Sequence, residues 1–228
     1  MKKFAFYVSN RATMFIEILR HVIRRDVSFP SCIEFVFIDS QPSAELESLC
    51  ASLNVRIIFE DLSVYPRRER GRIASDSVLE LLKAHDVDYL FILCDKILSG
   101  ELLTEYENRI VNTHPSVLPS FKGIKAIDQA IAARAFLLGL TVHFIDEHLD
   151  SGVPILQSIQ HHSFFKGDYM NILNDAIPAI LQVMHWISED RLSICDGFAK
   201  VEGATYQSGR FIPALEIPDL KSLVAENH

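Results

Sequence analysis

The sequence predicts an α/β protein with a mostly parallel central sheet flanked by helices, of the Rossmann-like type. Short apolar runs alternate with longer amphipathic stretches throughout the first half of the 228 residues. Candidate polar residues follow directly after apolar runs, at the strand ends where parallel sheets bind their ligands. Because alternating strands and helices build βαβ units, the pattern favours a doubly wound sheet.

The first half contains four expected strands and three expected helices. Each strand is a run of five or six mostly apolar residues, which is typical of a strand buried on both faces. The helices carry their apolar residues at spacings of three and four. We expect the strands at residues 4–8, 33–38, 55–59 and 89–93, and the helices at residues 13–24, 43–53 and 73–85.

The second half continues the alternation with less regular spacing. A strand is expected to end at Val111, and a long helix at residues 168–188 is expected to break or kink near Pro178, because proline lacks a backbone N–H. The other expected elements are a helical segment at residues 126–138, strands at 140–145 and 153–164, and short strands and turns over 189–228. We expect one main domain over residues 1–190 and a C-terminal extension over residues 191–228.

Composition and charge exclude several classes of protein. The chain is 49% hydrophobic with a net charge of −8, so it can build a core but lacks the clustered basic residues that nucleic-acid binding needs. No apolar stretch is long enough to span a bilayer. The four scattered cysteines, Cys32, Cys50, Cys94 and Cys195, form no C-x-x-C pair. We therefore expect a cytoplasmic protein with reduced thiols, no metal, and no nucleic-acid or membrane partner.

Three polar residues at two strand ends suggest acyl-transfer chemistry. Asn112 and His114 follow the strand that ends at Val111, and Asp150 follows the strand at residues 140–145. Transfer of a one-carbon acyl group to an amine passes through a tetrahedral oxyanion, to which a carboxamide and an imidazole can donate hydrogen bonds. Asp150 is suited to accept the amine proton, directly or through one water, and to keep His114 protonated. No covalent nucleophile is required.

Taken singly, each of these residues is more often a loop residue that satisfies nearby backbone groups. The longer segment is more specific. N-T-H-P-S-V-L-P-S-F-K-G begins at Asn112, T-V-H-F-I-D-E-H-L-D-S-G-V-P-I-L-Q begins at Thr141, and Asp150 lies 36 positions after His114. This segment resembles the signature of the 10-formyltetrahydrofolate-dependent formyltransferases, most closely the glycinamide ribonucleotide formyltransferases of purine biosynthesis.

The resemblance implies a Rossmann-like formyltransferase fold, a donor and a set of site residues. The donor is 10-formyltetrahydrofolate, used without a metal, and the family's catalytic residues fall on Asn112, His114 and Asp150. Lys96 stands where the family often has an arginine. The implied folate-binding residues are Cys94, Asp95, Lys96, Ile97, Leu98, Ile145, Asp146, Glu147, His148 and Leu149.

The acceptor is less defined, because the first turn departs from the pattern of the purine-pathway enzymes. Their glycine-rich turn binds the acceptor phosphate, whereas both glycines are missing here. Ser9 or Asn10 can equally cap the following helix, and the arginines of residues 66–72 can equally form a solvated basic patch. The candidate acceptor-binding residues are Ser9, Asn10, Arg11, Thr13, Arg70, Arg72 and Pro115.

We therefore expect an N-formyltransferase that uses a primary amine on a small, anionic acceptor. Glycinamide ribonucleotide is the default acceptor and an amino-sugar nucleotide is the rival. A homodimer is compatible with this expectation. Two alternatives remain open: a formyltetrahydrofolate hydrolase, in which water replaces the amine, and a non-catalytic folate-binding protein.

Overall fold

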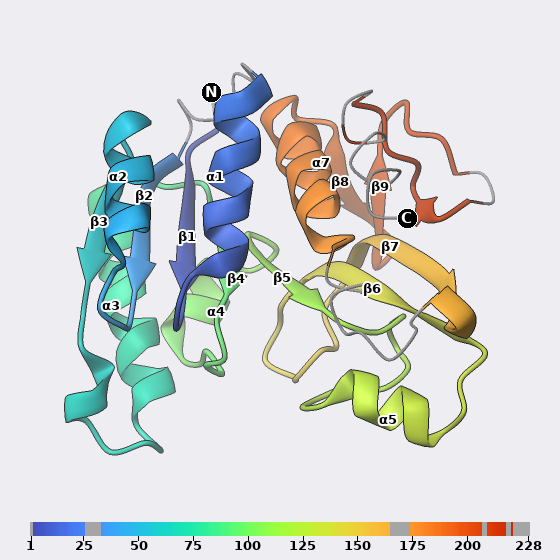
Figure 1. The fold of residues 1–228 in the computed structure, drawn as a ribbon, viewed down its shortest axis with the longest axis horizontal. Coiled ribbons are helices and arrows are strands. Elements are labelled where there is room, and N and C mark those ends of the chain that lie inside the picture. Colours follow the sequence, from blue (N-terminus) through green and yellow to red (C-terminus); the bar gives the residue numbers. More distant parts are fainter. Residues whose placement is uncertain (1, 26–32, 165–173, 207–208, 218–219, 221–228) are drawn as a thin grey trace. The chain divides into compact units, whose positions relative to one another are not determined.

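A computed structural model describes residues 2–25, 33–164, 174–206, 209–217 and 220. The chain divides into two compact units, which we call unit 1 (Met1–Val111) and unit 2 (Asn112–His228). Each unit contains part of the sheet and its own buried apolar residues (Figure 1). The fold class predicted from the sequence is confirmed.

The strands of unit 1 are all parallel and run in the order β4-β1-β2-β3. Their side chains explain this arrangement, since every residue of β1 is fully buried between its neighbours, as expected for a parallel strand covered on both faces. In the register, Phe6 of β1 lies opposite Val36 of β2 and Phe91 of β4. The strands are β1 (Phe4–Val8), β2 (Ile33–Ile38), β3 (Arg56–Phe59) and β4 (Tyr89–Leu93), which confirms all four predicted strands.

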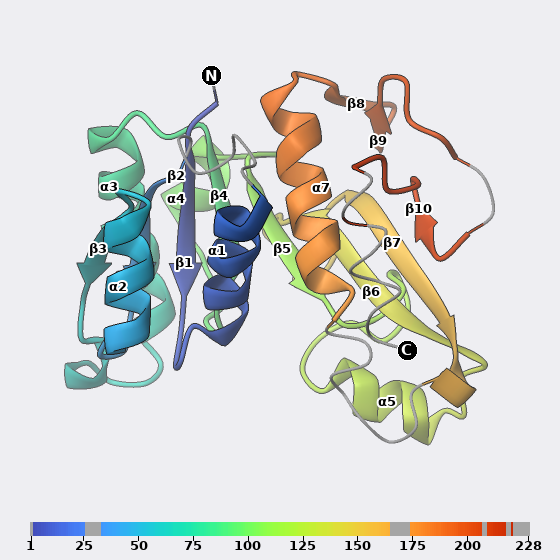
Figure 2. The ribbon, with the colours of Figure 1, turned by 45° about the horizontal axis from the view of Figure 1, so that its top comes forward.

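Helices cover both faces of this part of the sheet, with α1 and α2 on one side and α3 and α4 on the other (Figures 1 and 2). Helix α2 begins where the Ser43 hydroxyl accepts a hydrogen bond from the backbone of Leu46. Helix α3 begins three residues earlier than predicted, because its first turn is polar and adds nothing to the apolar period. The elements are α1 (Thr13–Arg25), α2 (Ala44–Ser52), α3 (Arg70–Ala84), the unpredicted α4 (Glu101–Glu105) and the 3-10 helix η2 (Leu62–Val64).

Unit 2 contains mainly antiparallel strands, in the order β10-β7-β6-β5, and a buried helix. β6 pairs antiparallel with β7, which pairs antiparallel with β10. Helix α7 packs on β6 and β7 and buries Trp186 completely. The elements are β5 (Ile110–His114), which crosses the unit boundary, α5 (Ala126–Ala132), β6 (Leu137–Phe144), β7 (Pro154–His161), the 3-10 helix η3 (His162–Phe164), α7 (Ala176–Ser188), the hairpin β8 (Leu192–Cys195) with β9 (Phe198–Val201), and β10 (Phe211–Ile212).

Several predicted boundaries in unit 2 are wrong. The strand predicted over residues 153–164 ends at His161, and residues 162–164 form the 3-10 helix η3. β5 does not end at Val111 but continues to His114, so Asn112 and His114 are strand residues and not loop residues. The helix predicted over residues 126–138 ends at Ala132, and β6 starts at Leu137. Arg134 adopts a left-handed conformation with φ 52°, and the N–H of Ala135 bonds to the carbonyl of Ala130. These are the features of a Schellman motif, and no glycine or asparagine marks this stop.

Pro178 does not break the last long helix in its interior, as predicted, but lies near the start of α7. Pro178 is the third residue of α7, in the first turn, where its missing N–H has no partner to lose. Of the helix predicted over residues 168–188, residues 168–173 lie outside the described residues. The described tail after α7 consists of short strands and turns, as expected, while the domain boundary at residue 190 stays a prediction. In the part of the chain that the structure describes, no helix combines the length and apolar character needed to cross a membrane.

Candidate active site

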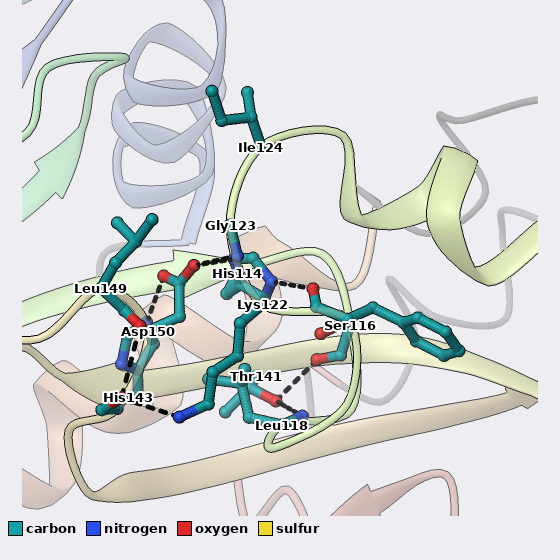
Figure 3. A network of polar contacts seen from close by, with 12 residues as sticks. His114, Ser116, Leu118, Lys122, Gly123, Ile124, Thr141, His143, Leu149 and Asp150 are labelled. Atoms are coloured by element: carbon teal, nitrogen blue, oxygen red, sulfur yellow. Dashed lines mark hydrogen bonds and ion pairs between the residues drawn. The ribbon is translucent and has the colours of Figure 1, made fainter.

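Unit 2 brings His114 and Asp150 together from different elements. His114 ends β5, and Asp150 follows the turn after β6, with its Oδ2 3.3 Å from His114 Nδ1 (Figure 3). Both side chains are 7% exposed. Gly152 allows the turn to fold back on β6, because a Cβ at this position would lie 1.9 Å from the carbonyl oxygen of Phe144. The carboxylate and the imidazole are thus held in a position shielded from water.

The loop after β5 contacts both members of this pair through its backbone. The N–H of Gly123 donates to Asp150 Oδ2 at 2.7 Å, and His114 Nε2 lies 2.9 Å from the carbonyl oxygen of Phe121. Lys122, between them, donates to the hydroxyl of Ser151 at 2.7 Å (Figure 3). These contacts are not predictable from the sequence, because backbone groups carry no signal in the residue types.

The contacts of His114 suggest the role of each ring nitrogen. A carbonyl oxygen only accepts hydrogen bonds, so the contact with Phe121 places a hydrogen on Nε2. Nδ1 faces Asp150 Oδ2 at 3.3 Å. The second oxygen of Asp150 is a further acceptor that this contact does not engage. The arrangement therefore contains both a proton acceptor and a hydrogen-bond donor.

A second histidine lies behind Asp150. His143 on β6 is completely buried, with Nδ1 2.8 Å from the carbonyl oxygen of Phe144 and Nε2 3.9 Å from Asp150 Oδ1. Burial lowers the pKa of His143 from its ordinary value, although the Asp150 charge opposes this change. A neutral ring whose Nδ1–H donates to Phe144 presents a bare Nε2 to the site. Among the described residues, this nitrogen has no hydrogen-bond partner.

Asn112 and Pro115 flank His114 on the chain. Alternate residues of a strand share a face, so Asn112 and His114 lie on the same face of β5; Asn112 is half-buried. Pro115, also half-buried, starts the loop. Thr141 on β6 holds this loop through two hydrogen bonds: its hydroxyl donates to the carbonyl of Ser116 and accepts from the N–H of Leu118.

The predicted folate-binding segment of unit 2 is mostly exposed. Ile145 is half-buried, and the next four residues, Asp146, Glu147, His148 and Leu149, are exposed. The Asp146 carboxylate accepts from the N–H of His148 at 2.8 Å, which shapes the turn. Leu149 is 51% exposed, and its Cδ2 would lie 3.7 Å from a Cβ placed on Gly123. An exposed leucine beside polar groups can provide an apolar contact for a ligand.

The predicted folate-binding segment of unit 1 follows β4 and is anchored by helix α3. A Cβ on Gly71 would lie 2.3 Å from the carbonyl oxygen of Ile97, so only glycine permits this close approach. The Ser75 hydroxyl on the same helix accepts from the N–H of Ser99 at 3.0 Å. Ile97 itself is 65% exposed. Leu98, in contrast, is buried and supports the loop from the core.

The polar residues of this loop are already paired. Lys96 Nζ contacts Asp39 Oδ2 at 3.0 Å and Asp95 Oδ1 at 2.5 Å. Burial raises the pKa of the Cys94 thiol to about 12, and the nearby carboxylate of Asp39 contributes. At neutral pH Cys94 is therefore a thiol and not a thiolate nucleophile.

The first turn of unit 1 contains four candidate acceptor-binding residues. Ser9 is buried and donates its hydroxyl proton to Asp39 Oδ2 at 2.9 Å. Asn10, Arg11 and Thr13 are exposed. Asp39 is not among the residues predicted from the sequence, although its position directly after the apolar run of β2 is a usable signal.

The two candidate arginines of α3 have partners within unit 1. Arg70 donates to the carbonyl oxygens of Tyr65 and Ser63, both at 3.0 Å, and so holds η2 against the start of α3. Arg72 forms an exposed ion pair with Asp76 one helical turn later. A role in acceptor binding stays a prediction for both. Among the described residues, no group of three or more potential ligands could hold a metal ion.

Comparisons with known proteins agree with this geometry. The family described as "Formyl transferase" matches residues 2–164. The phosphoribosylglycinamide formyltransferase of Bacillus subtilis (strain 168) is 30% identical over 158 residues, which cover 69% of this chain and 78% of that protein. The crystal structure of glycinamide ribonucleotide transformylase 1 from Symbiobacterium toebii superposes with a TM-score of 0.73 and 25% identity, covering 88% of this chain and 94% of the other.

A relative of different activity matches a shorter stretch. Formyltetrahydrofolate deformylase 2 of Arabidopsis thaliana is 38% identical over 98 residues, which cover 43% of this chain and 29% of that protein. The match to the formyl transferase family is longer, since it spans more than half of the chain. It includes β5, β6 and the His114–Asp150 pair. The chain therefore belongs to the formyl transferase family.

Proposed function

We propose that this protein transfers the formyl group of 10-formyltetrahydrofolate to a primary amine. The observation that carries the proposal is the pairing of His114 with Asp150 at 3.3 Å, with Asn112 on the same face of β5 as His114. The family relationship supports the donor and the type of reaction, because relatives are named phosphoribosylglycinamide formyltransferase. No metal takes part in the proposed reaction.

In the proposed reaction, the amine nitrogen attacks the formyl carbon and a negative charge develops on the formyl oxygen. Asn112 donates one hydrogen bond to this oxyanion. His114 donates another through Nε2–H, once this group leaves the carbonyl of Phe121. Asp150 accepts the proton of the attacking amine on Oδ1, because Oδ2 is engaged by Gly123 and His114. Collapse of the intermediate breaks the bond to the folate nitrogen, which takes up the proton held by Asp150 as it leaves.

The remaining site residues have proposed binding roles. Residues 94–98 and 145–149 hold the folate, and Ser9, Asn10, Arg11, Thr13, Arg70, Arg72 and Pro115 hold the acceptor. The catalytic domain covers residues 1–190 in this proposal, and the protein works in the cytoplasm. Glycinamide ribonucleotide is the default acceptor, and an amino-sugar nucleotide is the rival.

The test of the proposed function is amine-dependent consumption of 10-formyltetrahydrofolate, followed by absorbance. We expect turnover with one acceptor of a panel that includes glycinamide ribonucleotide and amino-sugar nucleotides. Asp150→Asn and His114→Ala should each lower turnover by about a hundredfold or more, because they remove a proton acceptor and an oxyanion donor. Folate affinity, measured by calorimetry, should change little.

Asp196→Asn and His185→Gln are matched controls for these substitutions. Asp196 is exposed in the turn between β8 and β9 and His185 pairs with Glu189 on α7, and neither is a candidate site residue. Both controls should keep wild-type turnover. Full activity in either Asp150→Asn or His114→Ala would show that the assigned roles are wrong.

A hydrolase is the second candidate function, because a formyltetrahydrofolate deformylase matches 43% of the chain. Water would then replace the amine at the same site. The same assay separates the two: folate consumption without any amine supports the hydrolase. Folate binding without turnover, across the whole acceptor panel, supports a protein that only binds folate.

A further inference from the structure

Four side chains of unit 1 meet at the carboxyl ends of three neighbouring parallel strands. Tyr7 and Ser9 come from the end of β1, Asp39 from the end of β2 and Lys96 from the loop after β4. The Tyr7 hydroxyl donates to Asp39 Oδ2 at 3.0 Å, the Ser9 hydroxyl at 2.9 Å, and Lys96 Nζ lies 3.0 Å from the same oxygen. We call these four residues the Asp39 cluster.

The Asp39 cluster is buried and its charges are fixed. The Asp39 side chain is 4% exposed, and Tyr7 is fully buried. Burial, together with the nearby Cys94 and Asp39, raises the pKa of Tyr7, so its hydroxyl stays neutral and can only donate to the carboxylate. Burial opposes the charge of Lys96, but hydrogen bonds to Asp95 and Asp39 outweigh it and raise the pKa of Lys96.

The hydrogen-bond donors of the Asp39 cluster already contact an anion, the Asp39 carboxylate. A phosphate at the first turn would require free N–H or O–H donors and a positive local charge. Here the Ser9 hydroxyl and the Lys96 ammonium both point at Asp39, and Lys96 also contacts Asp95. Two carboxylates against one ammonium leave a net negative charge, which repels a phosphate at this position.

The second oxygen of Asp39 remains available. All three donors contact Oδ2, and among the described residues Oδ1 accepts no hydrogen bond. A carboxylate that follows the second strand of a βαβ unit commonly accepts hydrogen bonds from sugar hydroxyls. β1 also lies between β2 and β4, where the chain reverses its direction across the sheet, and parallel sheets bind ligands at such points.

We propose that the Asp39 cluster is a subsite for sugar hydroxyl groups of the acceptor and excludes phosphate from the first turn. This inference rests on the proposed formyl transfer and narrows the acceptor class. The acceptor presents a hydroxylated ring to Asp39. Any acidic group of the acceptor lies elsewhere, for example at Arg11, which is exposed.

The first experiment titrates the full-length protein with inorganic phosphate by calorimetry, without folate. Wild-type protein should not bind phosphate in the millimolar range. Asp39→Asn should gain phosphate binding by at least tenfold, because Lys96 and two hydroxyls lose their shared carboxylate. Adding Lys96→Met to Asp39→Asn should remove the gain. Asp95→Asn is the matched control, since it removes one negative charge beside Lys96 but leaves the donors engaged by Asp39, and its gain should stay below that of Asp39→Asn.

The second experiment compares binding of glycinamide riboside with binding of glycinamide ribonucleotide, which differ only by the phosphate. Asp39→Asn should weaken riboside binding about tenfold, because the ring hydroxyls lose their acceptor. Ser9→Ala should leave the ratio of the riboside and ribonucleotide affinities as it is in wild-type protein, because the proposal places no phosphate at Ser9. The comparison with Ser9→Ala decides the matter even when Asp39→Asn does not fold.

Three results would overturn the proposal. The first is that wild-type protein binds the ribonucleotide ten times more tightly than the riboside and that Ser9→Ala abolishes this preference. The second is that a folded Asp39→Asn protein gains no phosphate binding. The third is that wild-type protein binds neither the riboside nor the ribonucleotide. Because phosphate titration needs neither folate nor turnover, its failure is distinguishable from failure of the proposed function, which appears as absent formyl transfer to every amine.

Discussion

At the scale of single residues, one oxygen atom of Asp150 makes two of the main contacts of the candidate active site. Asp150 Oδ2 accepts the N–H of Gly123 at 2.7 Å and faces His114 Nδ1 at 3.3 Å. Asp150 adopts a left-handed backbone conformation with φ 51°, which aspartate tolerates better than most residues. The turn after β6 can therefore place a carboxylate at this position where many turns place a glycine.

His143 provides a test of the electrostatics around Asp150. Its folded-state pKa is lowered below the ordinary value of 6.5 by burial. The unfolded chain therefore takes up the proton first as the pH falls, so the stability contributed by a neutral His143 is present above about pH 6.5 and is lost below it. We expect the free energy of unfolding to fall more steeply between pH 7 and pH 5.5 in wild-type protein than in His143→Gln.

Urea unfolding at several pH values measures this difference. His185→Gln is the control, because His185 lies near the surface of α7 in an ion pair with Glu189 and its side chain is 26% exposed. Equal pH slopes for wild-type protein and His143→Gln would show that His143 does not titrate as burial requires.

At the scale of elements, the tail after α7 is tied into unit 2 and is not a loose appendage. β10 extends the sheet by pairing with β7, and Arg210 beside it forms a two-pronged contact with Asp175, at 2.7 and 3.2 Å. The Asp175 side chain is 2% exposed and also accepts from Gln160. The predicted boundary at residue 190 therefore separates segments that share a buried ion pair.

Arg210→Met should destabilise the protein by about 3–5 kcal/mol, because removal of one partner leaves a buried charge uncompensated. Removal of residues 191–228 should cost at least as much, since β7 also loses its neighbour. The measurement is urea unfolding followed by circular dichroism, with the fluorescence of the fully buried Trp186 as a second probe.

Arg72→Met is the control for this loss of stability. It breaks an exposed ion pair within one helix, which contributes only about 0.3–0.5 kcal/mol. A stable, cooperatively unfolding chain of residues 1–190 would show that the tail is dispensable.

At the scale of the whole molecule, the sequence predicted the strands better than the helix ends. A short apolar run such as residues 4–8 predicts a buried strand directly, and this strand is fully buried. The start of α3 and the end of α5 were missed, because a polar first turn and a Schellman motif at Arg134 lack a signal in the residue types.

The candidate site was predictable to a similar degree. The signature segment identified His114 and Asp150 as candidates, and the structure places them in contact, while their catalytic roles stay predictions. Asp39 was missed because it belongs to no motif and its partners Ser9 and Lys96 are distant in the sequence, and its place directly after the apolar run of β2 was the one signal left unused. The contacts of Phe121 and Gly123 were missed because backbone atoms form them.

The loop after β5 contacts the imidazole and the carboxylate through two backbone groups only two residues apart, the carbonyl of Phe121 and the N–H of Gly123. A ligand that displaces this loop would therefore break its contacts with the imidazole and with the carboxylate in one movement. If folate does so, the N–H of Gly123 loses the hydrogen bond that protects it from exchange with water. We expect folate binding to change the hydrogen exchange of this amide, and an unchanged exchange rate with folate bound would show that the loop stays in place.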